Sequence, residues 1–378
     1  AINQRTVKDS YALPRIDEIF DSLQGAKYFT TLDMKAAYHQ VEVEEEHKPR
    51  TAFTVGPYGF YQYSRMPFGL TNSPATYERI VEQCLGDLNM RICVCYLDDV
   101  IIYSSTFKEH LDNIDTVFSR IKGCNLKLAA EKCQFYKQKV SFLGHVVGGD
   151  GIETDPDKIA KVRDWPTPKN TEELRSFLAF TGYYRRFIKD FSKITRPLAD
   201  LIPPITKKKG LRTPTKEWHW MDTEQQIFDD LKTKLTSPPI LAYPDFNMPF
   251  ELHTDVSTKG LGAVLYQDQD GRKRVIAYAS RSLSKSEKNY SAFKLEFLCL
   301  KWAVTITVDT ITYLQTVHVT VSVYLFTCIV PSCIVIHCLC VVKFSCLVCL
   351  FHSLVQILCV FSSCPVLCPC NSISLVLH

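Results

Sequence analysis

Apolar and polar residues follow two different spacings in the first part of the chain, and each spacing predicts an element. Residues 14–24 place apolar side chains three or four positions apart and end before Gly25, which predicts a short helix. The following run is strand-like as far as Asp33, and Val41 and Val43 then alternate with acidic residues as in a second strand. An acid therefore stands at the end of a predicted strand.

A second acidic group lies between two strand-like runs. Residues 92–96 and 100–103 are mostly β-branched, aromatic or small and apolar, so Leu97, Asp98 and Asp99 are expected to form the turn of a hairpin. Tight hairpin turns favour Gly or Asn because they need positive φ, and this turn has neither. We therefore expect a strained backbone of the kind found at functional sites, with an ordinary exposed turn as the alternative.

Helical patterns flank this hairpin on both sides. Ser73 and Pro74 are expected to form an N-cap and a first turn, because the apolar residues that follow repeat at helical spacing. After the hairpin, residues 108–122 have another apolar face, for which we expect burial of Leu111, Ile114, Val117, Phe118 and Ile121. The order strand, helix, hairpin, helix predicts an α+β layer.

The character of the sequence changes near residue 155, where we place a domain boundary. Pro166 and Pro168 interrupt the chain, and Asn170 with Glu173 resembles a capping box that begins a helix. The basic residues of this segment are left for solvent or for phosphate groups, and they are Arg175, Arg185, Arg186 and Lys189. A solvated basic face and a nucleic-acid surface both fit this pattern.

A third unit begins near Phe246. The residues that follow alternate as in a strand, break at Gly260 and Gly262, and resume as a strand before a helical pattern in residues 286–304. From residue 305 the chain is almost free of charge and rich in Val, Leu, Cys and Ile. Length and hydropathy allow a membrane span there, but flanking basic residues and aromatic belts are missing, so we favour translated non-coding or frame-shifted sequence.

Charge and cysteine content bear on two questions, whether the protein binds nucleic acid and whether it is secreted. The net charge is +4 over 378 residues, and because Asp309 and Lys343 cancel, all of it belongs to residues 1–304. This charge permits a nucleic-acid partner without proving one. The cysteines of that part lack metal-ligand spacing, which favours reduced thiols and a cytosolic or nuclear protein rather than a secreted one. The chain begins at Ala1 with polar residues, so we expect a fragment without a secretory signal.

Acids at two predicted strand ends point to one reaction in particular. Asp33 and the pair Asp98 and Asp99 supply hard carboxylate oxygens, which are the ligands that Mg²⁺ prefers. Two such ions about 3.5–4 Å apart drive in-line phosphoryl transfer, one by activating the attacking hydroxyl and the other by holding a triphosphate. Bound ions also explain how clustered like charges are tolerated. The pattern therefore predicts a two-metal site that uses Mg²⁺ or Mn²⁺.

Longer motifs occur in a fixed order along the chain. Among them are VKDSYALPRIDEIFD, FTTLDMKAAYHQV, RTAFTVGPYGFYQYSRMPFGLTNSPATY, YLDDVIIYS, KCQFYKQKVSFLGHVV, WPTPKNTEELRSFL, YYRRFIKDFSKI and PFELHTDVSTKGLGAVL. In these motifs the chain resembles the pol polyprotein of gypsy-type long-terminal-repeat retrotransposons, which is related to retroviral reverse transcriptases. The resemblance covers nearly all of residues 1–304 and none of the residues that follow.

This resemblance implies a right-hand polymerase fold and RNA-directed DNA polymerase activity. The palm and part of the fingers would occupy residues 1–155, the thumb and connection residues 156–245, and a truncated ribonuclease H-like α/β unit residues 246–304, with an aberrant apolar tail at 305–378. The implied partners are dNTPs, an RNA template, a DNA primer and an RNA–DNA hybrid, in a cytoplasmic or nuclear retroelement particle. The family's strand pair with basic residues for the triphosphate precedes the matching sequence, so we expect part of the fingers to be missing.

Residue by residue, the resemblance makes Asp33, Asp98 and Asp99 the polymerase carboxylates. Tyr38 would lie beneath the incoming sugar and exclude a 2′-hydroxyl, although a core aromatic is the alternative that the residue pattern allows. The other assignments are Phe68 and Gly69 beneath the nascent base pair, Phe142, Leu143, Gly144 and His145 in the primer grip, and Arg175, Arg185 and Arg186 in a thumb that follows the duplex phosphates.

Two further acids belong to the ribonuclease H-like segment. Asp255 matches the first metal-binding Asp of that family and Glu296 its Glu. Two later acidic positions of the family pattern would lie beyond Val304, where the chain departs from it, and we expect the sheet edge near Asp255 to be uncovered. The sequence therefore indicates a polymerase with an incomplete ribonuclease H unit. The alternatives are a relic that only binds nucleic acid and a membrane-anchored product.

Overall fold

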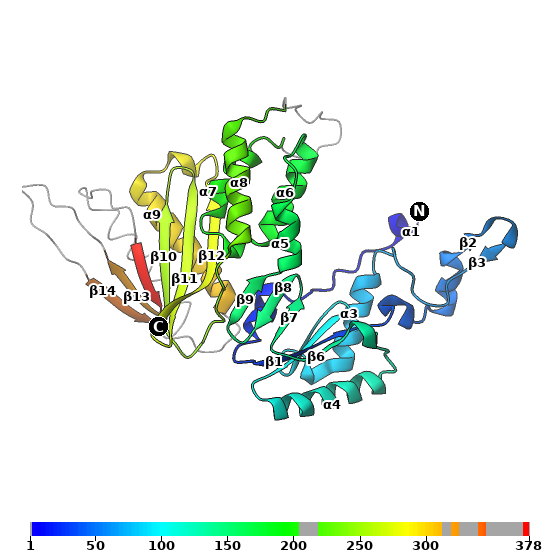
Figure 1. The fold of residues 1–378 in the computed structure, drawn as a ribbon. Helices are drawn as coiled ribbons and strands as arrows, with labels where there is room; N and C mark the ends of the chain where they lie inside the picture. Colours follow the sequence, from blue (N-terminus) through cyan, green and yellow to red (C-terminus); the bar gives the residue numbers. More distant parts are fainter. Residues whose placement is uncertain (1, 204–217, 312–318, 325–338, 345–372, 378) are drawn as a thin grey trace, which may run out of the picture. The chain divides into compact units, whose positions relative to one another are not determined.

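The computed structural model describes residues 2–203, 218–311, 319–324, 339–344 and 373–377 (Figure 1). The chain divides into two compact units, residues 1–152 and 153–378. Both units combine helices with strands, and the predicted α+β class is confirmed. Within the described ranges, no helix is both long enough and apolar enough to cross a membrane.

The first unit is built around a four-stranded sheet. Its elements, with η for 3₁₀ helices, are α1 (Ile2–Arg5), α2 (Ile16–Asp21), β1 (Tyr28–Asp33), η1 (Ala37–Gln40), η2 (Glu45–Thr51), β2 (Phe53–Thr54), η3 (Gly56–Tyr58), β3 (Phe60–Tyr61), α3 (Ser73–Leu85), η4 (Gly86–Leu88), β4 (Cys93–Tyr96), β5 (Asp99–Ser104), α4 (Phe107–Gly123), η5 (Ala130–Lys132), β6 (Gln134–Lys137), β7 (Lys139–Phe142), β8 (His145–Gly148) and β9 (Gly151–Thr154). The sheet has the antiparallel order β4-β5-β1-β6. Strands β7-β8-β9 form a smaller sheet, and the boundary between the two units falls within β9.

One apolar cluster holds this sheet to its two long helices. Alternate residues of β4 and β5, such as Cys95 and Ile102, are fully buried and share the cluster with Val81 of α3 and Val117 of α4. The predicted hairpin, the strand that ends at Asp33 and both helices are therefore confirmed. Their patterns were readable because each element buries one face.

Two local predictions in this unit are wrong. Val41 and Val43 do not lie in a strand, because the preceding residues wind into η1 and the two valines pack against the core from a loop. Ser73 is not the N-cap of α3, since Asn72 takes that position and Ser73 is the first helical residue. The Ser73 hydroxyl instead donates to the carbonyl of Pro67, at 3.2 Å, and is buried there.

The buried face of α4 also differs from the prediction, most at Leu111, while Phe118 is only partly buried. Leu111 is 41% exposed, whereas its neighbour His110 is fully buried. The His110 ring lies 2.8 Å from the Thr30 hydroxyl and 2.7 Å from the Ser104 hydroxyl. These two hydrogen bonds satisfy both ring nitrogens, so a polar residue takes a core position that the apolar pattern assigned to its neighbour.

The second unit joins a group of helices to another antiparallel sheet. Its elements are α5 (Pro156–Arg163), α6 (Thr171–Tyr183), η6 (Arg185–Phe187), α7 (Phe191–Ala199), α8 (Asp222–Thr236), β10 (Phe250–Val256), β11 (Gly260–Gln269), β12 (Arg272–Ser282), η7 (Glu287–Asn289), α9 (Ala292–Ile311), β13 (Val319–Tyr324), β14 (Leu339–Phe344) and β15 (Ile373–Leu377). The sheet order is β12-β11-β10-β15. Helix α9 packs on β10 and β11, and residues such as Leu252 and Leu300 form the core between them (Figure 1).

Three features of this sheet differ from the prediction. Gly260 and Gly262 do not break the strand but lie within β11, and the break falls before Gly260. Helix α9 continues beyond Val304 to Ile311. The edge of β10 is not uncovered, because β15 pairs with it in antiparallel register, with Phe250 opposite Leu377. Most of the remaining predicted tail lies outside the described residues.

The predicted start of α6 is confirmed. Asn170 is the N-cap, and its side chain accepts hydrogen bonds from the backbone N–H groups of Glu172 at 3.0 Å and Glu173 at 2.9 Å. Leu174 and Phe177 on the same helix are fully buried. The cap therefore fixes the start of a helix whose apolar face is part of the unit's core.

We expect Asn170→Ala to lower the free energy of unfolding by about 1 kcal/mol, because two backbone N–H groups lose their acceptor. Urea denaturation can be followed by tryptophan fluorescence, to which Trp165 contributes with its ring 5.7 Å from that of Phe177. Asn170→Ser keeps a capping oxygen and serves as the control, with most of the stability retained. Equal losses in the two variants would show that the cap bonds are not the cause.

Candidate functional site

The acids of the first unit meet at the end of its sheet. Asp33 is the last residue of β1 and Asp99 is the first residue of β5, and the antiparallel register places their Cα atoms directly opposite each other. Asp98 precedes Asp99 in the turn that leads out of β4. Asp98 and Asp99 are exposed and Asp33 is half-buried. Three carboxylates that are distant in the sequence are thus gathered at one sheet end.

The electrostatics of this group reflect crowding of like charges. Desolvation, and then the charges of Asp98 and Asp33, raise the pKa of Asp99. Lys132, which the sequence analysis did not single out, lies beside Asp33, with its Nζ 3.4 Å from Asp33 Oδ1. The Lys132 side chain is 63% exposed, so this ion pair is well screened by solvent and its contribution to stability is small. The negative charge of the three acids is therefore only partly compensated.

The turn that carries Asp98 is strained, as predicted. Leu97 has a φ of +57°, in the left-handed region that a branched side chain rarely adopts. Its backbone N–H donates to Glu78 Oε2 at 2.5 Å, and Glu78 on α3 is fully buried. A charge-assisted hydrogen bond of this kind is stronger than a neutral one and can hold an unfavourable backbone conformation in place.

Glu78 was missed by the sequence analysis, although the sequence contains a signal for it. Glu78, Val81 and Leu85 follow the i, i+3, i+7 spacing of one buried helix face, so an acidic residue occupies an apolar position. Burial, as the largest effect, raises the pKa of Glu78 to about 6, and the hydrogen bond from Leu97 acts in the opposite direction. A buried acid whose pKa is raised in this way marks a position where geometry is held at the expense of stability.

Tyr38 lies near these acids, two residues after Ala36, whose backbone is in the left-handed region. Ala36 has a φ of +49° at the start of η1, and Tyr38 in η1 is half-buried. The Tyr38 ring centroid lies 5.2 Å from that of Phe68 and 5.7 Å from that of Tyr77. Burial, and then the charge of Asp98, raise the pKa of Tyr38. Tyr38 therefore has both core contacts and a position close to Asp98.

The loop that carries Phe68 and Gly69 is tied to the start of the chain. Phe68 is 65% exposed, and Gly69 has a φ of +86°, which favours glycine. Asn3 donates from Nδ2 to the Gly69 carbonyl at 2.7 Å and accepts at Oδ1 from the Thr71 N–H at 3.0 Å. Asn72 donates to the Val7 carbonyl at 2.9 Å. These amide contacts, which the sequence did not reveal, hold the loop with its aromatic side chain exposed.

The residues predicted for the primer grip form a β-hairpin. Phe142 ends β7 and His145 begins β8, and both side chains are buried, with the His145 ring 4.8 Å from that of Phe20. Leu143 and Gly144 form the turn, with φ values of +45° and +67°. A ligand would therefore meet the turn, whereas Phe142 and His145 support it from the core.

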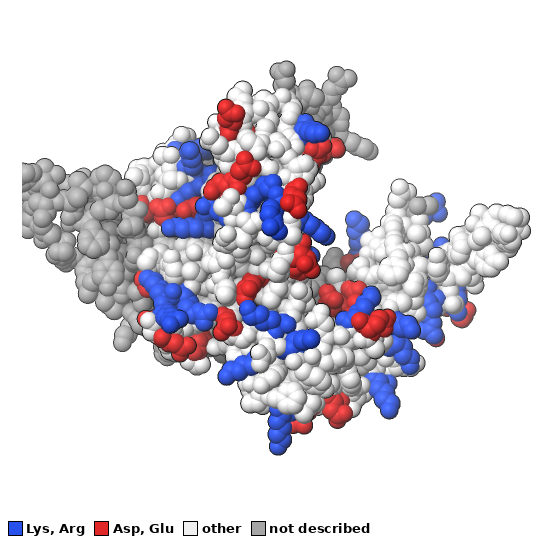
Figure 2. All heavy atoms as spheres, in the orientation of Figure 1, with Lys and Arg blue, Asp and Glu red and all other residues white. Residues whose placement is uncertain are grey.

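The three predicted thumb arginines are in the second unit. Arg175 on α6 and Arg185 in η6 are exposed, and Arg186 is half-buried. On the face shown in Figure 2, lysine and arginine side chains are interspersed with aspartate and glutamate instead of forming one basic stripe. The arginines are accessible to phosphates, but the drawn face has no large field of one sign.

Asp33, Asp98 and Asp99, here called the Asp33 group, resemble the ligand set of a divalent metal ion in some respects and not in others. Within the described ranges, no three His, Cys, Asp or Glu side chains are arranged to hold a metal ion. The donor set nonetheless fits Mg²⁺ or Mn²⁺, because it consists of hard oxygens at one sheet end and its like charges raise the pKa of Asp99. The acids therefore fit a divalent ion in kind and place, without a preformed cage.

The acids of the ribonuclease H-like segment have a different environment. Asp255 on β10 is exposed and is paired with the ammonium of Lys193, a residue to which the sequence analysis gave no role. Glu296 on α9 is 8% exposed, and its Oε2 has no hydrogen-bond partner among the described residues. Desolvation, and then the charge of Asp255, raise the pKa of Glu296 to about 7. Asp255 already has a cation, so this pair does not fit a divalent ion as it stands.

We expect the stability contributed by Glu78 to depend on pH. Its folded pKa, about 6, is higher than its ordinary value of 4.5, so this contribution is fully present below pH 4.5 and is lost as the pH rises through 6. Between pH 4.5 and 7.5, the unfolding free energy of the unmodified chain should fall by up to about 2 kcal/mol relative to Glu78→Gln. Urea denaturation at several pH values measures this difference, with exposed Glu131→Gln as the control. A pH-independent difference would contradict the expectation.

Two protein families match separate parts of the chain. Residues 1–147 match the family described as reverse transcriptase (RNA-dependent DNA polymerase), and residues 220–320 match the RNase H-like domain found in reverse transcriptase. The carboxylates at the end of the first unit's sheet, Asp33, Asp98 and Asp99, lie in the first match. Asp255 and Glu296 lie in the second. Lys193 lies in neither.

Solved structures of similar fold come from foamy viral enzymes. The protease-reverse transcriptase dRH in complex with double-stranded DNA has a TM-score of 0.71 and 23% identity, covering 83% of this chain and 53% of that one. The protease-reverse transcriptase in complex with an RNA/DNA hybrid has a TM-score of 0.68 and 22% identity, covering 82% of this chain and 40% of that one. These similarities show a reverse transcriptase fold.

Curated relatives are polyproteins of mobile elements. The retrovirus-related Pol polyproteins from transposons opus and gypsy of Drosophila melanogaster are 40% and 38% identical over 303 and 307 residues. Both matches cover 80% of this chain, but the chain spans only 30% and 29% of the length of these relatives. The Tf2-3 polyprotein of Schizosaccharomyces pombe is 35% identical over 300 residues. The chain therefore carries a reverse transcriptase domain and an RNase H-like domain and is homologous to part of the retrovirus-related Pol polyproteins of transposons.

Proposed function

We propose that the chain is an RNA-directed DNA polymerase that adds dNTPs to a primer by two-metal phosphoryl transfer. The observation that carries this proposal is the register of β1 and β5, which sets Asp33 opposite Asp99 with Asp98 on the adjoining turn. This arrangement lies within the residues that match the reverse transcriptase family. The similar polyproteins come from transposons, which supports a retrotransposon enzyme.

The three carboxylates share one task in this proposal, and two neighbouring residues support them. Asp33, Asp98 and Asp99 would hold the divalent ions, Mg²⁺ or Mn²⁺, and the bound ions would supply positive charge for activating the primer hydroxyl and neutralising the leaving pyrophosphate. Glu78 fixes the Leu97 backbone and thereby positions Asp98. Lys132 neutralises part of the charge of Asp33, and its exposed side chain can withdraw into solvent.

The residues around the carboxylates select and align the substrate. Tyr38 lies under the sugar of the incoming dNTP, where its ring leaves no room for a 2′-hydroxyl. Its contacts with Phe68 and Tyr77 support this role because they fix the ring. Phe68 and Gly69 contact the nascent base pair, and the bonds from Asn3 keep their loop in position. Substrate choice then depends on shape more than on charge.

The nucleic-acid partners are an RNA template, a DNA primer and the RNA–DNA hybrid that they form. The similar foamy viral structures contain double-stranded DNA or an RNA/DNA hybrid, which supports partners of this kind. Arg175, Arg185 and Arg186 contact backbone phosphates, and the turn at Leu143 and Gly144 contacts the primer. In this proposal residues 1–155 form the palm and part of the fingers, residues 156–245 the thumb and connection, and residues 246–304 the ribonuclease H-like unit.

We expect Asp98→Asn to reduce Mg²⁺- or Mn²⁺-dependent primer extension on an RNA template by on the order of a hundredfold or more, as the loss of one preorganised electrostatic group does elsewhere. Asp115→Asn is the control, because Asp115 is exposed on α4, away from the sheet end. Unchanged extension by Asp98→Asn would overturn the assignment of Asp98. Template binding without extension by the unmodified chain would favour a relic that only binds nucleic acid.

We expect Tyr38→Val to relax sugar selection, since a smaller side chain leaves room for the 2′-hydroxyl. The measurement is the ratio of ribonucleotide to deoxynucleotide incorporation in primer extension, which should rise. Tyr38→Phe retains the ring and should keep the original ratio. An active Tyr38→Val variant with an unchanged ratio would return Tyr38 to the role of a packing residue in the cluster with Phe68 and Tyr77.

A further inference from the structure

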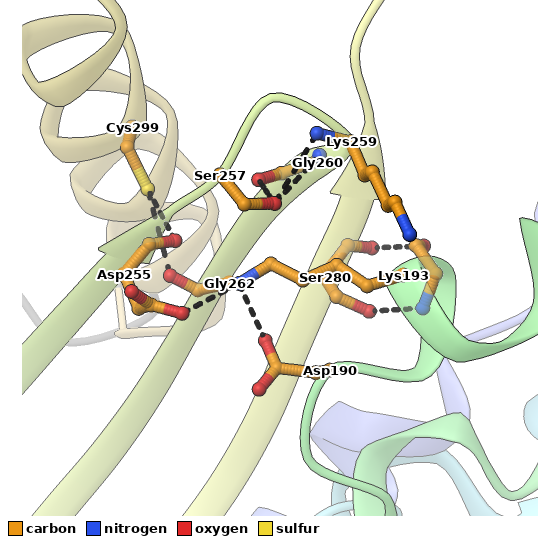
Figure 3. Close-up of polar contacts among 10 residues, drawn as sticks. Asp190, Lys193, Asp255, Ser257, Lys259, Gly260, Gly262, Ser280 and Cys299 are labelled. Atoms are coloured by element: carbon orange, nitrogen blue, oxygen red, sulfur yellow. Dashed lines mark hydrogen bonds and ion pairs between the residues drawn. The ribbon is translucent and has the colours of Figure 1, made fainter. Parts of the chain in front are cut away.

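Asp255 is held by a cation that belongs to the chain itself. The Nζ atom of Lys193 lies 2.5 Å from Asp255 Oδ2 and 3.1 Å from Asp190 Oδ1 (Figure 3). The Lys193 side chain is only 15% exposed, whereas that of Asp255 is 53% exposed. One largely buried ammonium is therefore shared between two carboxylates, which is a stronger arrangement than a solvent-exposed ion pair.

The helix that carries Lys193 is fixed to the sheet by specific contacts. Ser192 of α7 donates from its backbone N–H to Ser280 Oγ at 2.8 Å and from its own Oγ to the Ser280 carbonyl at 2.9 Å. Ser280 lies on β12, so these bonds attach the first turn of α7 to the sheet strand next to β11. The Lys193 ammonium therefore belongs to a helix that is hydrogen-bonded to the sheet, and its side chain is largely buried.

One glycine of β11, Gly262, makes this close approach possible. A Cβ atom at Gly262 would lie 2.5 Å from Asp190 Oδ1, and one at Gly260 would lie 2.8 Å from the Arg281 carbonyl and 3.4 Å from Lys193 Cγ. Contacts under about 3.0 Å do not occur between unshifted atoms, so any other residue would displace its neighbour. Gly262, one of the two glycines that resemble a strand break in the sequence, therefore leaves the space that the Asp190 side chain occupies, whereas Gly260 leaves space for the Arg281 carbonyl of the neighbouring strand.

From this geometry we propose that Lys193 is the resident counter-charge of Asp255 and excludes divalent cations from it while α7 is docked. A metal ion at Asp255 would meet a like charge at hydrogen-bonding distance from the same carboxylate. The lysine comes from outside the segment that matches the RNase H-like domain, so the preceding helix controls the acid of the sheet. This inference does not depend on the polymerase proposal.

The test is Mn²⁺ binding to the full-length chain, measured by electron paramagnetic resonance. Asp98→Asn and Asp99→Asn are present throughout, so that ions at the other acid group do not contribute. With Lys193 in place, adding Asp255→Asn should leave Mn²⁺ binding unchanged. Replacing Lys193 by Met should add one Mn²⁺ site at Asp255. The affinity of Asp255 for Mn²⁺ should then be at least about tenfold higher than in the chain that retains Lys193. That new site should disappear when Asp255→Asn is added to Lys193→Met.

Matched variants separate charge from packing. Lys193→Arg keeps the positive charge and should gain no Mn²⁺ site, and Lys285→Met removes a charge from an exposed position of the same unit and should also gain none. The proposal is overturned if Asp255→Asn removes a Mn²⁺ site from the chain that retains Lys193, a result that needs no folded Lys193 variant. It is also overturned if folded Lys193→Met, checked by circular dichroism, binds no additional Mn²⁺.

Discussion

The register between β1 and β5 is the constraint on which the candidate polymerase site depends. The core sets this register, because Leu32 opposite Val100 is fully buried at the pair that adjoins Asp33 and Asp99. A slip of one residue would move every side chain of β1 to the other face of the sheet, so apolar burial resists it strongly. The position of the acids is therefore fixed by hydrophobic packing that has no chemical role of its own.

This arrangement has local costs that the surrounding residues offset. The chain must turn within two residues, Leu97 and Asp98, while presenting the carboxylates of Asp98 and Asp99, and Leu97 adopts a left-handed conformation to do so. Glu78 stabilises that conformation through its backbone contact, although burying a carboxylate raises its pKa and weakens the fold at neutral pH. Strain, buried charge and crowded acids occur together here because the ordinary packing of the sheet allows none of them to relax.

Local patterns predicted most of the framework, and long-range contacts account for what they missed. The hairpin, the strand ending at Asp33 and the cap at Asn170 were predictable, because each depends on residues that are neighbours in sequence. Glu78 bonds to a backbone group 19 positions away and Lys193 to a side chain 62 positions away. Periodicity carries no information on such pairs. The family resemblance suggested roles for conspicuous acids, but it did not reveal the residues that hold them.

The two acid groups of the chain illustrate how environment, rather than residue type, decides what a carboxylate can do. Asp33 has a lysine neighbour that is mostly exposed, so water screens their attraction and the lysine can leave at little cost. Asp255 has a lysine that is mostly buried, shared with Asp190 and carried by a helix fixed through Ser280. Removing that ammonium would leave two carboxylates without their cation, which is costly in a partly buried setting. The first group is open to an external ion, whereas the second contains its own.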